Sequence, residues 1–392
     1  MHVYKKPSGK WAYKIDIGKN PLTGKRQQKE KGGFARAKDA KIAGEKMLQQ
    51  LRSKVFSRPE SITFGDFAAE WLEAYKTLVK ISTVRIREHQ LLNLKRFFDK
   101  IPLQQIGKKQ YQDALLALSK DFSPNTISGI HATARMIFRR AKEYDLILTD
   151  PTEYATVPRP KRKIVDPDST VPPYLEKDQL LAFLSVAEKN GYPPDYELFS
   201  LLSYTGLRIG EALALTWEDV DFKKNILKVS KTLYNPTNRA ESYSLLPPKT
   251  ETSVRIISLP TSLRSLLARH KLETSSLRLE YGSEWHIPER SQLGFIFTAP
   301  THPGFPLTQR LVQIRIDRLQ RLMLGKIPFR IHPHIFRHTH ASLLAEAGVD
   351  LVQIMKRLGH ADDSITRQIY LHVTKTAATE TAERFDKLLN SK

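Results

Sequence analysis

Residues 332–372 read HPHIFRHTHASLLAEAGVDLVQIMKRLGHADDSITRQIYLH, and this stretch decides how the rest of the chain is interpreted. It brings His334, Arg337, His360 and Tyr370 close together in sequence. The first three side chains are cationic or can transfer a proton, and the tyrosine is the one plausible nucleophile. Such a set suits an anionic phosphate better than a carbonyl or a sugar. We therefore expect the remaining chain to deliver a phosphate to this stretch.

The histidines of the same stretch also allow a zinc interpretation. His334 and His338 have the four-residue spacing of a helical metal-binding pair. Ile335, however, stands where a zinc protease carries its glutamate, and no cysteine or nearby carboxylate completes a ligand set. Metal-dependent nucleases hold Mg²⁺ with clustered carboxylates, whereas these residues are mostly cationic. We predict a site without a metal ion or any other cofactor.

The composition predicts a multidomain protein of the cytoplasm. A chain of 392 residues is too long for one ordinary core, so two or three domains are expected. The sequence has no apolar run long enough to span a membrane, and Met1–Lys10 lacks the apolar core of a signal peptide. It also has no cysteine, which excludes disulfides and fits a reducing compartment.

The charge of the chain favours nucleic acid as the partner. There are 63 Lys and Arg against 41 Asp and Glu, which gives a net charge of +22. A merely basic soluble protein would be the alternative on charge alone. Residues 1–60, however, hold 16 of the basic and only 5 of the acidic side chains, which indicates a localised basic module.

Residues 1–58 are predicted to form a small sheet followed by a helix. Apolar and polar side chains alternate from Trp11 to Ile17, the pattern of a strand with one buried face. The predicted elements are strands at 11–17 and 25–31, a turn at 20–24, and a helix at 35–52 on the apolar face. The opposite face would enter a DNA major groove with Lys14, Lys25, Arg26 and Lys29, unless it is simply a solvated basic face.

After a linker at 58–61, residues 61–158 are predicted to form an all-α domain. Apolar residues from Phe64 to Tyr75 recur at three- and four-residue spacing. Further helices are predicted at 82–98, 108–118 and 125–144. Arg139 lies in a basic stripe of the last helix and is a candidate DNA contact, although a solvated helix face would look the same.

A proline-rich linker separates this domain from the C-terminal one. Six prolines fall between 151 and 173, and Arg159–Lys163 adds basic charge, so residues 159–173 are expected to be extended. From residue 174 the pattern predicts a mixed, mainly helical domain with a small antiparallel sheet. Its predicted elements are helices at 176–187 and 197–204, strands at 225–230 and 255–259, and mostly helices from 309 onward.

Six residues in a fixed order carry a family resemblance. They are Arg208 in TGLRIGEALAL, Lys249 in PPKTETSVRIISLP, His334 and Arg337 in HPHIFRHTHAS, His360 in RLGHADDS, and Tyr370 in RQIYLH. Each motif alone would more often be structural. Together they resemble the catalytic set of the tyrosine recombinase (phage integrase) family, and GKWAYKIDIGKNPLTGKRQQKEKGGFARAKDA resembles the N-terminal arm-binding domain of phage and conjugative-transposon integrases.

The resemblance implies a site-specific recombinase that integrates and excises a mobile element in a bacterial host. It implies an arm-type DNA-binding domain at 1–58, a core-binding domain at 61–158 and a catalytic domain at 174–392. The expected partners are double-stranded DNA at core and arm-type sites, further copies in a tetramer on DNA, and an excisionase or host DNA-bending protein. The alternatives are a topoisomerase of type IB and a non-catalytic architectural protein.

The chemistry of the six residues agrees with this resemblance. Arg208 and Arg337 can neutralise the charge that builds up on the phosphate oxygens, and His334 and His360 add donors. Tyr370 would attack phosphorus to form a 3′-phosphotyrosyl ester, while Lys249 protonates the departing 5′ oxygen. Because the ester retains the energy of the broken bond, rejoining needs no ATP.

The spacing of His360 and Tyr370 constrains their placement. On one straight helix they would lie about 15 Å apart and roughly 80° around the axis. We therefore expect His360 at a helix start capped by Asp362, Asp363 or Ser364, and the tyrosine on a later, separately placed element that could be mobile. An amphipathic tail at 374–392 packs either on its own domain or, as the resemblance implies, on a neighbouring protomer.

Overall fold

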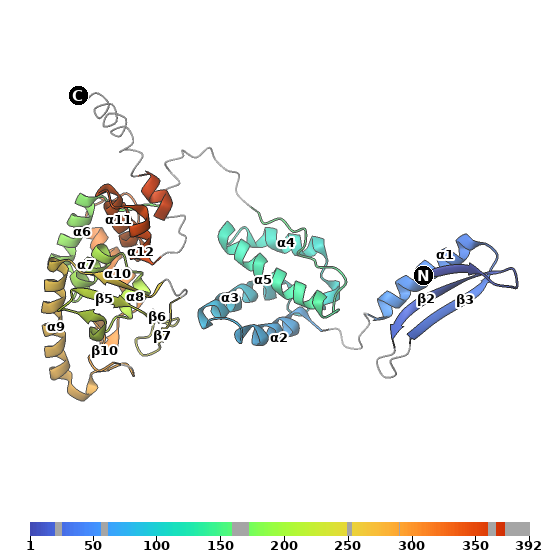
Figure 1. The fold of residues 1–392 in the computed structure, drawn as a ribbon, viewed down its shortest axis with the longest axis horizontal. Coiled ribbons are helices and arrows are strands. Elements are labelled where there is room, and N and C mark those ends of the chain that lie inside the picture. The colour runs from blue at the N-terminus through green and yellow to red at the C-terminus, as the bar shows by residue number, and fades with distance from the viewer. Residues whose placement is uncertain are drawn as a thin grey trace, which may run out of the picture. The chain divides into compact units, whose positions relative to one another are not determined.

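The computed structural model describes residues 1–19, 26–55, 62–158, 172–248, 253–289, 291–359 and 366–372. The chain divides into two compact units, Met1–Arg162 and Lys163–Lys392, which are taken one at a time (Figure 1). The predicted turn at 20–24, most of the two predicted linkers and the tail at 374–392 lie outside the described residues. None of the helices in the described parts of the chain has the length and apolar character that a membrane span requires.

The first unit begins with a three-stranded antiparallel sheet in the order β1-β2-β3. Its elements are β1 (His2–Lys5), β2 (Trp11–Lys19), β3 (Arg26–Phe34) and the helix α1 (Ala37–Val55). Tyr13 and Ile15 of β2 are buried as the alternation predicts. At Gly44 of α1 an added Cβ would lie 3.1 Å from the Tyr13 ring, so the helix approaches this face closely. The first strand was not predicted.

The register of β2 and β3 corrects the predicted basic face. Residues paired across antiparallel strands point to the same side of a sheet. Lys14 pairs with Glu30, whereas Lys29 pairs with the buried Ile15. The two lysines therefore lie on opposite faces, and the face that α1 leaves open carries Asp16 and Glu30 as well as Lys14.

The helices of residues 62–158 follow the prediction closely. They are α2 (Phe64–Lys76), α3 (Ile81–Phe98), α4 (Lys108–Leu118) and α5 (Pro124–Glu143). Thr63 and Ser123 cap α2 and α5 by accepting hydrogen bonds from backbone N–H groups three residues later. Apolar stripes of all four helices meet in one core, as expected of an all-α domain.

The second unit is mainly helical with small antiparallel sheets, as predicted. Its helices are α6 (Lys177–Asn190), α7 (Asp195–Thr205), α8 (Ile209–Leu213), α9 (Thr261–Tyr281), α10 (Gln309–Leu322), α11 (Pro333–Glu346) and α12 (Leu351–Leu358). Strands β4 (Val220–Asp221), β5 (Ile226–Val229) and β8 (Arg255–Ser258) form one sheet in that order. Two hairpins join β6 (Thr232–Tyr234) to β7 (Ser244–Leu246), and β9 (Thr298–Ala299) to β10 (His302–Pro306).

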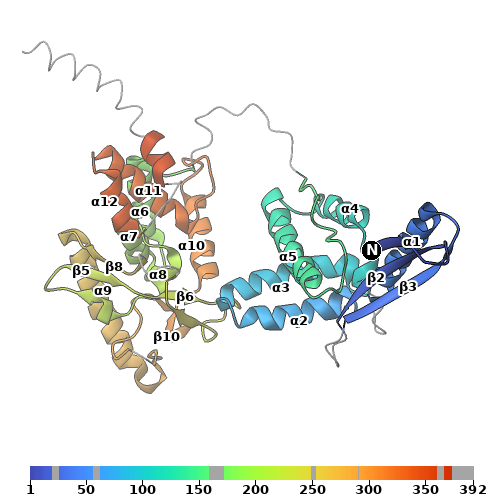
Figure 2. The same cartoon turned by 45° about the vertical axis from the view of Figure 1, so that its right-hand side comes forward.

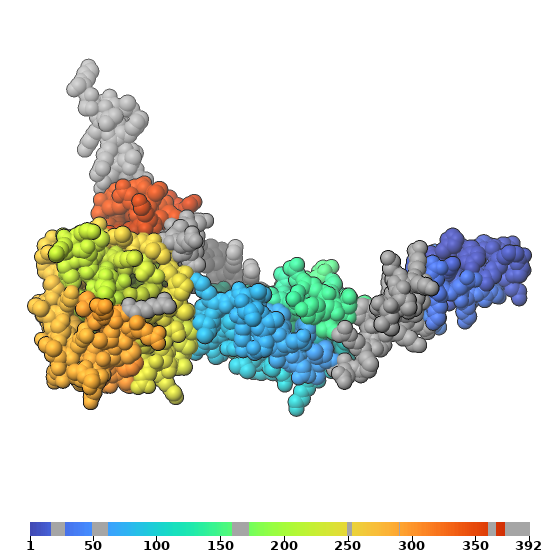
Figure 3. Space-filling model, turned by 60° about the horizontal axis from the view of Figure 1, so that its bottom comes forward, coloured from blue at the N-terminus to red at the C-terminus, as the bar shows by residue number. Residues whose placement is uncertain are grey.

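An aromatic cluster fixes α7 against α11 in the core of this unit. The rings of Phe183, Phe199 and Phe336, from α6, α7 and α11, lie 5.3–5.5 Å apart between centroids. All three side chains are fully buried. α11 and α12 lie side by side, and at the C-terminal end of α7 the Tyr204 carbonyl accepts a hydrogen bond from Nη2 of Arg357 in α12 (Figure 2). With residues 366–372, these last helices form one end of the unit (Figure 3, red).

Candidate active site

The turn between α7 and α8 presents Arg208. Gly206 ends α7 with φ 64°, a left-handed conformation that glycine adopts at little cost. Arg208 then precedes the first turn of α8, and Glu211 accepts its backbone N–H at 3.1 Å. The same carboxylate accepts Nη1 of Arg208 at 3.0 Å. The Arg208 side chain remains 36% exposed, so a substrate can reach the guanidinium.

Glu211 itself is buried and shared with a second arginine. Nη2 of Arg255, on β8, donates to Glu211 at 2.9 Å, and both side chains are nearly inaccessible. Burial alone would raise the pKa of Glu211. The hydrogen bond and charge of Arg255, together with those of Arg208, outweigh burial and hold the pKa below its usual value. Glu211 is therefore a carboxylate in the folded protein.

Arg337 ties three segments together from α11. Its side chain is buried, Nη1 donates to the carbonyl of Gly206 at 2.7 Å, and Nη2 donates to the carbonyl of Leu358 at 2.7 Å. The Arg208 turn and the C-terminal end of α12 are thus both bonded to one guanidinium. The predicted arginines, which are distant in sequence, converge on one site.

His334, one turn before Arg337, completes the described cluster. Burial lowers its pKa, the positive charges of His332, Arg337 and Arg208 lower it further, and Glu211 opposes them. Because its pKa is depressed, His334 is neutral at pH 7, so its ring offers one donor and one acceptor.

Tyr370 lies on a helical segment, residues 366–372, that follows α12. The fully buried Ile369 packs with Ala341 and Ala345 of α11 and with Ile354 and Leu358 of α12. Tyr370 is half-buried against the same cluster. The tyrosine therefore occupies an element separate from α12. Its predicted separation from a helix start at His360 stays a prediction, because residues 360–365 lie outside the described residues.

Two of the six predicted catalytic residues, Lys249 and His360, lie outside the described residues, as do the predicted caps at 362–364. The structure describes the chain on either side of both. Lys249 belongs to the connection from β7 to β8, and His360 follows Gly359, which ends α12 with φ 72°.

The predicted DNA-binding residues are distributed over the first unit. Lys29 is exposed and Lys14 is half-buried, whereas Lys25 and the side chain of Arg26 lie outside the described residues. Arg139 is 80% exposed, and its Nε lies 3.3 Å from a carboxylate oxygen of Glu143.

Arg255 contacts the site through Glu211 and was not predicted from the sequence. In RIIS the side chains alternate between buried and exposed, and Arg255 takes an inward position. A charged residue at an inward position of a strand indicates a buried partner of opposite charge, and this pattern could have identified Arg255 from the sequence. The partner itself, Glu211, could not be identified because it lies 44 positions away.

Comparison with known proteins agrees with this arrangement. Residues 173–377 match the Phage integrase family, residues 2–51 an Arm DNA-binding domain, and residues 63–119 the N-terminal SAM-like domain of phage integrases. The integrase of Staphylococcus phage L54a is 28% identical over 363 residues, which cover 88% of this chain and 98% of that protein.

Two solved structures share the fold. The Tn1549 transposon integrase in complex with a circular intermediate DNA has a TM-score of 0.66 at 22% identity, covering 83% of this chain and 100% of that one. A lambda integrase tetramer bound to a Holliday junction has a TM-score of 0.57 at 17% identity, covering 92% of this chain and 96% of that one.

The chain has the fold of a DNA strand-exchange enzyme. Its site, rich in arginine and histidine and accompanied by a tyrosine, agrees with that class. Because the match at 173–377 spans more than half of the sequence, the chain belongs to the phage integrase family. It is a tyrosine-type site-specific recombinase.

Proposed function

We propose that this recombinase integrates and excises a mobile element by cleaving each DNA strand through a 3′-phosphotyrosyl bond at Tyr370. The observation that carries the proposal is that Arg208 and Arg337 meet at the α7–α8 turn, with His334 one turn before Arg337 on α11, in the unit that also holds Tyr370. Two guanidinium groups beside a neutral imidazole form a site for a phosphodiester.

In the proposed cleavage step, the Tyr370 oxygen bonds to phosphorus as the bond from phosphorus to the 5′ oxygen breaks. The phenol proton passes to a histidine, and Lys249 protonates the departing 5′ oxygen. Arg208 and Arg337 stabilise the charge on the non-bridging oxygens. Attack by a 5′ hydroxyl of another strand then releases Tyr370 and completes the exchange.

The proposed partners are core-type DNA for residues 61–158 and 174–392, arm-type DNA for residues 1–58, and three further copies of the chain. The lambda integrase tetramer bound to a Holliday junction supports a tetrameric assembly. An excisionase or a host DNA-bending protein is proposed to set the direction of the reaction in a bacterial cytoplasm.

The proposal is tested with a nicked duplex that spans one end of the element. Cleavage beside the nick releases a short fragment, so the covalent complex accumulates. We expect a denaturation-resistant adduct with the wild-type protein and none with Tyr370→Phe, while both proteins bind the duplex equally. An adduct of undiminished yield from Tyr370→Phe would exclude Tyr370 as the nucleophile.

A further inference from the structure

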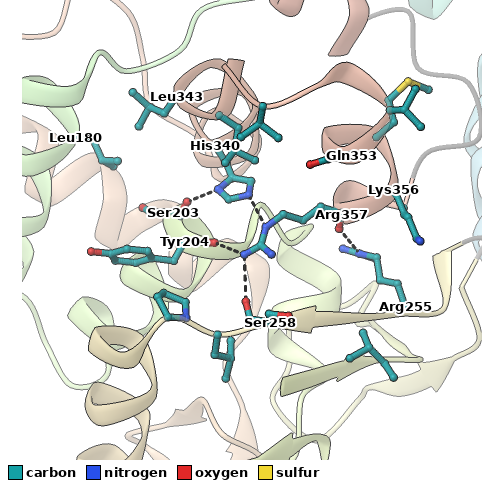
Figure 4. Close-up of a pocket in the computed structure, with 18 of the residues that line it drawn as sticks. Leu180, Ser203, Tyr204, Arg255, Ser258, His340, Leu343, Gln353, Lys356 and Arg357 are labelled. Carbon is teal, nitrogen blue, oxygen red and sulfur yellow. Dashed lines mark hydrogen bonds between the residues drawn. The ribbon is translucent and has the colours of Figure 1, made fainter. Parts of the chain in front are cut away.

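Arg255 is a buried arginine that donates to three separate groups. It is 8% exposed, and its neighbours in β8 alternate between the core and the surface. Nη2 and Nη1 donate to the two oxygens of Glu211 at 2.9 and 3.4 Å, and Nη1 also donates to the Ser253 carbonyl at 3.1 Å. Nε donates to the carbonyl of Arg357 at 2.9 Å (Figure 4). Burying a guanidinium is costly unless its donors are used, and here all three nitrogens are used.

At one end Arg255 controls the charge around Arg208. Arg208 and Glu211 alone would form a neutral pair, in which the carboxylate cancels the cation that faces the substrate. Arg255 supplies a second cation to the same carboxylate, so the three side chains together carry one net positive charge. Glu211 can then orient Arg208 through its backbone and side chain without neutralising it.

At its other end Arg255 fixes the last turn of α12. It holds the carbonyl of Arg357 while Arg337 holds the next carbonyl, that of Leu358. At Gly359 an added Cβ would lie 3.0 Å from Cδ and 3.1 Å from Nη1 of Arg255, so the backbone passes directly against this side chain. The next residue in the chain is His360.

We propose that Arg255 is a positioning residue of the recombination reaction. Through Glu211 it fixes the position of Arg208, and through the Arg357 carbonyl it fixes the end of α12 that leads to His360. Its charge also keeps the phosphate-facing side of the site positive. This inference rests on the proposed function of Arg208 as a phosphate ligand.

The test compares two buried arginines of the same unit. Arg255→Lys keeps the charge but replaces the planar guanidinium with a single ammonium nitrogen, which cannot reproduce the bonds that Nε, Nη1 and Nη2 make to separate segments. Arg315→Lys is the matched control, because Nη1 of Arg315 donates to Asp195 at 2.7 Å and to the Pro193 carbonyl at 3.2 Å, and this pair is equally buried. Arg315 belongs to α10, and within the described parts of the chain its hydrogen bonds go to Asp195 and Pro193 and not to the site, so its replacement reports the cost of disturbing a buried pair.

The readout is single-turnover cleavage of the nicked duplex carrying either a phosphate or a neutral methylphosphonate at the cleavage position. Removing the negative charge from the substrate reduces the need for a correctly placed cation. We expect Arg255→Lys to bind the duplex normally and to cleave the phosphate substrate about 10- to 100-fold more slowly. The decrease in its cleavage rate on the methylphosphonate substrate should be several-fold smaller, as we also expect for Arg208→Ala. Arg315→Lys should cleave both substrates at the wild-type rate.

A change of substrate cannot rescue a folding defect, so the comparison separates positioning from stability. If Arg255→Lys matched Arg315→Lys on both substrates, or lost equal activity on both, the proposal would be overturned. If it did not fold, Arg255→Gln would be measured instead, and failure of both to fold would make Arg255 a folding residue only. Absence of any adduct from the wild-type protein would instead overturn the proposed function.

Discussion

At the scale of single residues, Glu211 decides how the cations of the site are arranged. It accepts hydrogen bonds from Arg208 at 3.0 Å and from Arg255 at 2.9 Å while almost completely buried. A buried carboxylate between two arginines is fixed by hydrogen bonds and by opposite charge on both sides. Neither guanidinium can therefore move independently of it.

Replacing Glu211 with glutamine should therefore destabilise the C-terminal unit. Arg255 would remain buried without its opposite charge, and we expect the free energy of unfolding to fall by about 3–5 kcal/mol. Urea unfolding measures this change. Glu143→Gln, which removes the partner of the exposed Arg139 and Arg140, is the control and should cost less than about 1 kcal/mol. Equal effects of the two substitutions would contradict the buried-pair interpretation.

His340 makes the same unit sensitive to acid. Burial and the charge of Arg357 lower its pKa from 6.5 to about 3, and its ring nitrogens bond the Ser203 carbonyl and Nε of Arg357. The unfolded chain binds a proton at His340 more readily than the folded chain does. The contribution of neutral His340 to the free energy of unfolding is therefore fully present above pH 6.5. It is lost as the pH falls toward 3, at up to about 1.4 kcal/mol per pH unit. Urea unfolding at pH 7 and pH 5 should show a smaller pH dependence for His340→Gln than for wild type. Equal pH dependence in both proteins would refute this assignment.

The sequence alone predicted part of the site. Arg208, His334 and Arg337 could be assigned because each stands in a short motif, and the structure brings them together. Arg255 could not be assigned a partner, because its bonds to Glu211 and Arg357 span 44 and 102 positions. Pairings of that length are set by tertiary packing and leave no periodic signal in either segment.

At the scale of elements, the site depends on the meeting of the α7–α8 turn with the ends of α11 and α12. Helices with regular apolar stripes and clear caps, such as α2 after Thr63 and α5 after Ser123, were predicted to within two residues. The long α9 was not predicted. Its buried stripe includes His270 and Thr274, which weakens the apolar repeat that marks a helix.

The helical segment that carries Tyr370 packs on the unit through an apolar side chain. Ile369 is fully buried between α11 and α12. Ile369→Ala should cost about 2–5 kcal/mol of local docking energy. Amide hydrogen exchange should then accelerate at least tenfold in residues 366–372, while α7 keeps its protection. Unchanged exchange in this segment, or equal acceleration in α7, would contradict local docking.

At the scale of the whole molecule, the chain places its most basic region at the N-terminus. Residues 1–60 hold 16 of the 63 basic side chains, and among the described residues the apolar core of residues 62–158 includes none from the N-terminal sheet. The helical domain therefore has a core of its own, so removal of the N-terminal module should leave it folded.

Deleting residues 1–58 tests whether this module recognises separate DNA sites. We expect the truncated protein to lose binding to arm-type sites and to retain cleavage of the nicked core duplex. Its affinity for full-length element ends should also depend less steeply on salt, because fewer phosphates are contacted. Binding titrations at several salt concentrations measure both effects. Intact sequence-specific binding at every site would show that the module is not a DNA reader.

The nucleophile can be assigned by identifying the residue that carries the DNA. The covalent complex formed on the nicked duplex is digested with trypsin and nuclease, and the modified peptide is sequenced by mass spectrometry. Trypsin should release QIYLHVTK, residues 368–375, and the nucleotide 3′-phosphate should be attached to Tyr370. A nucleotide on any other residue would show that Tyr370 is not the nucleophile.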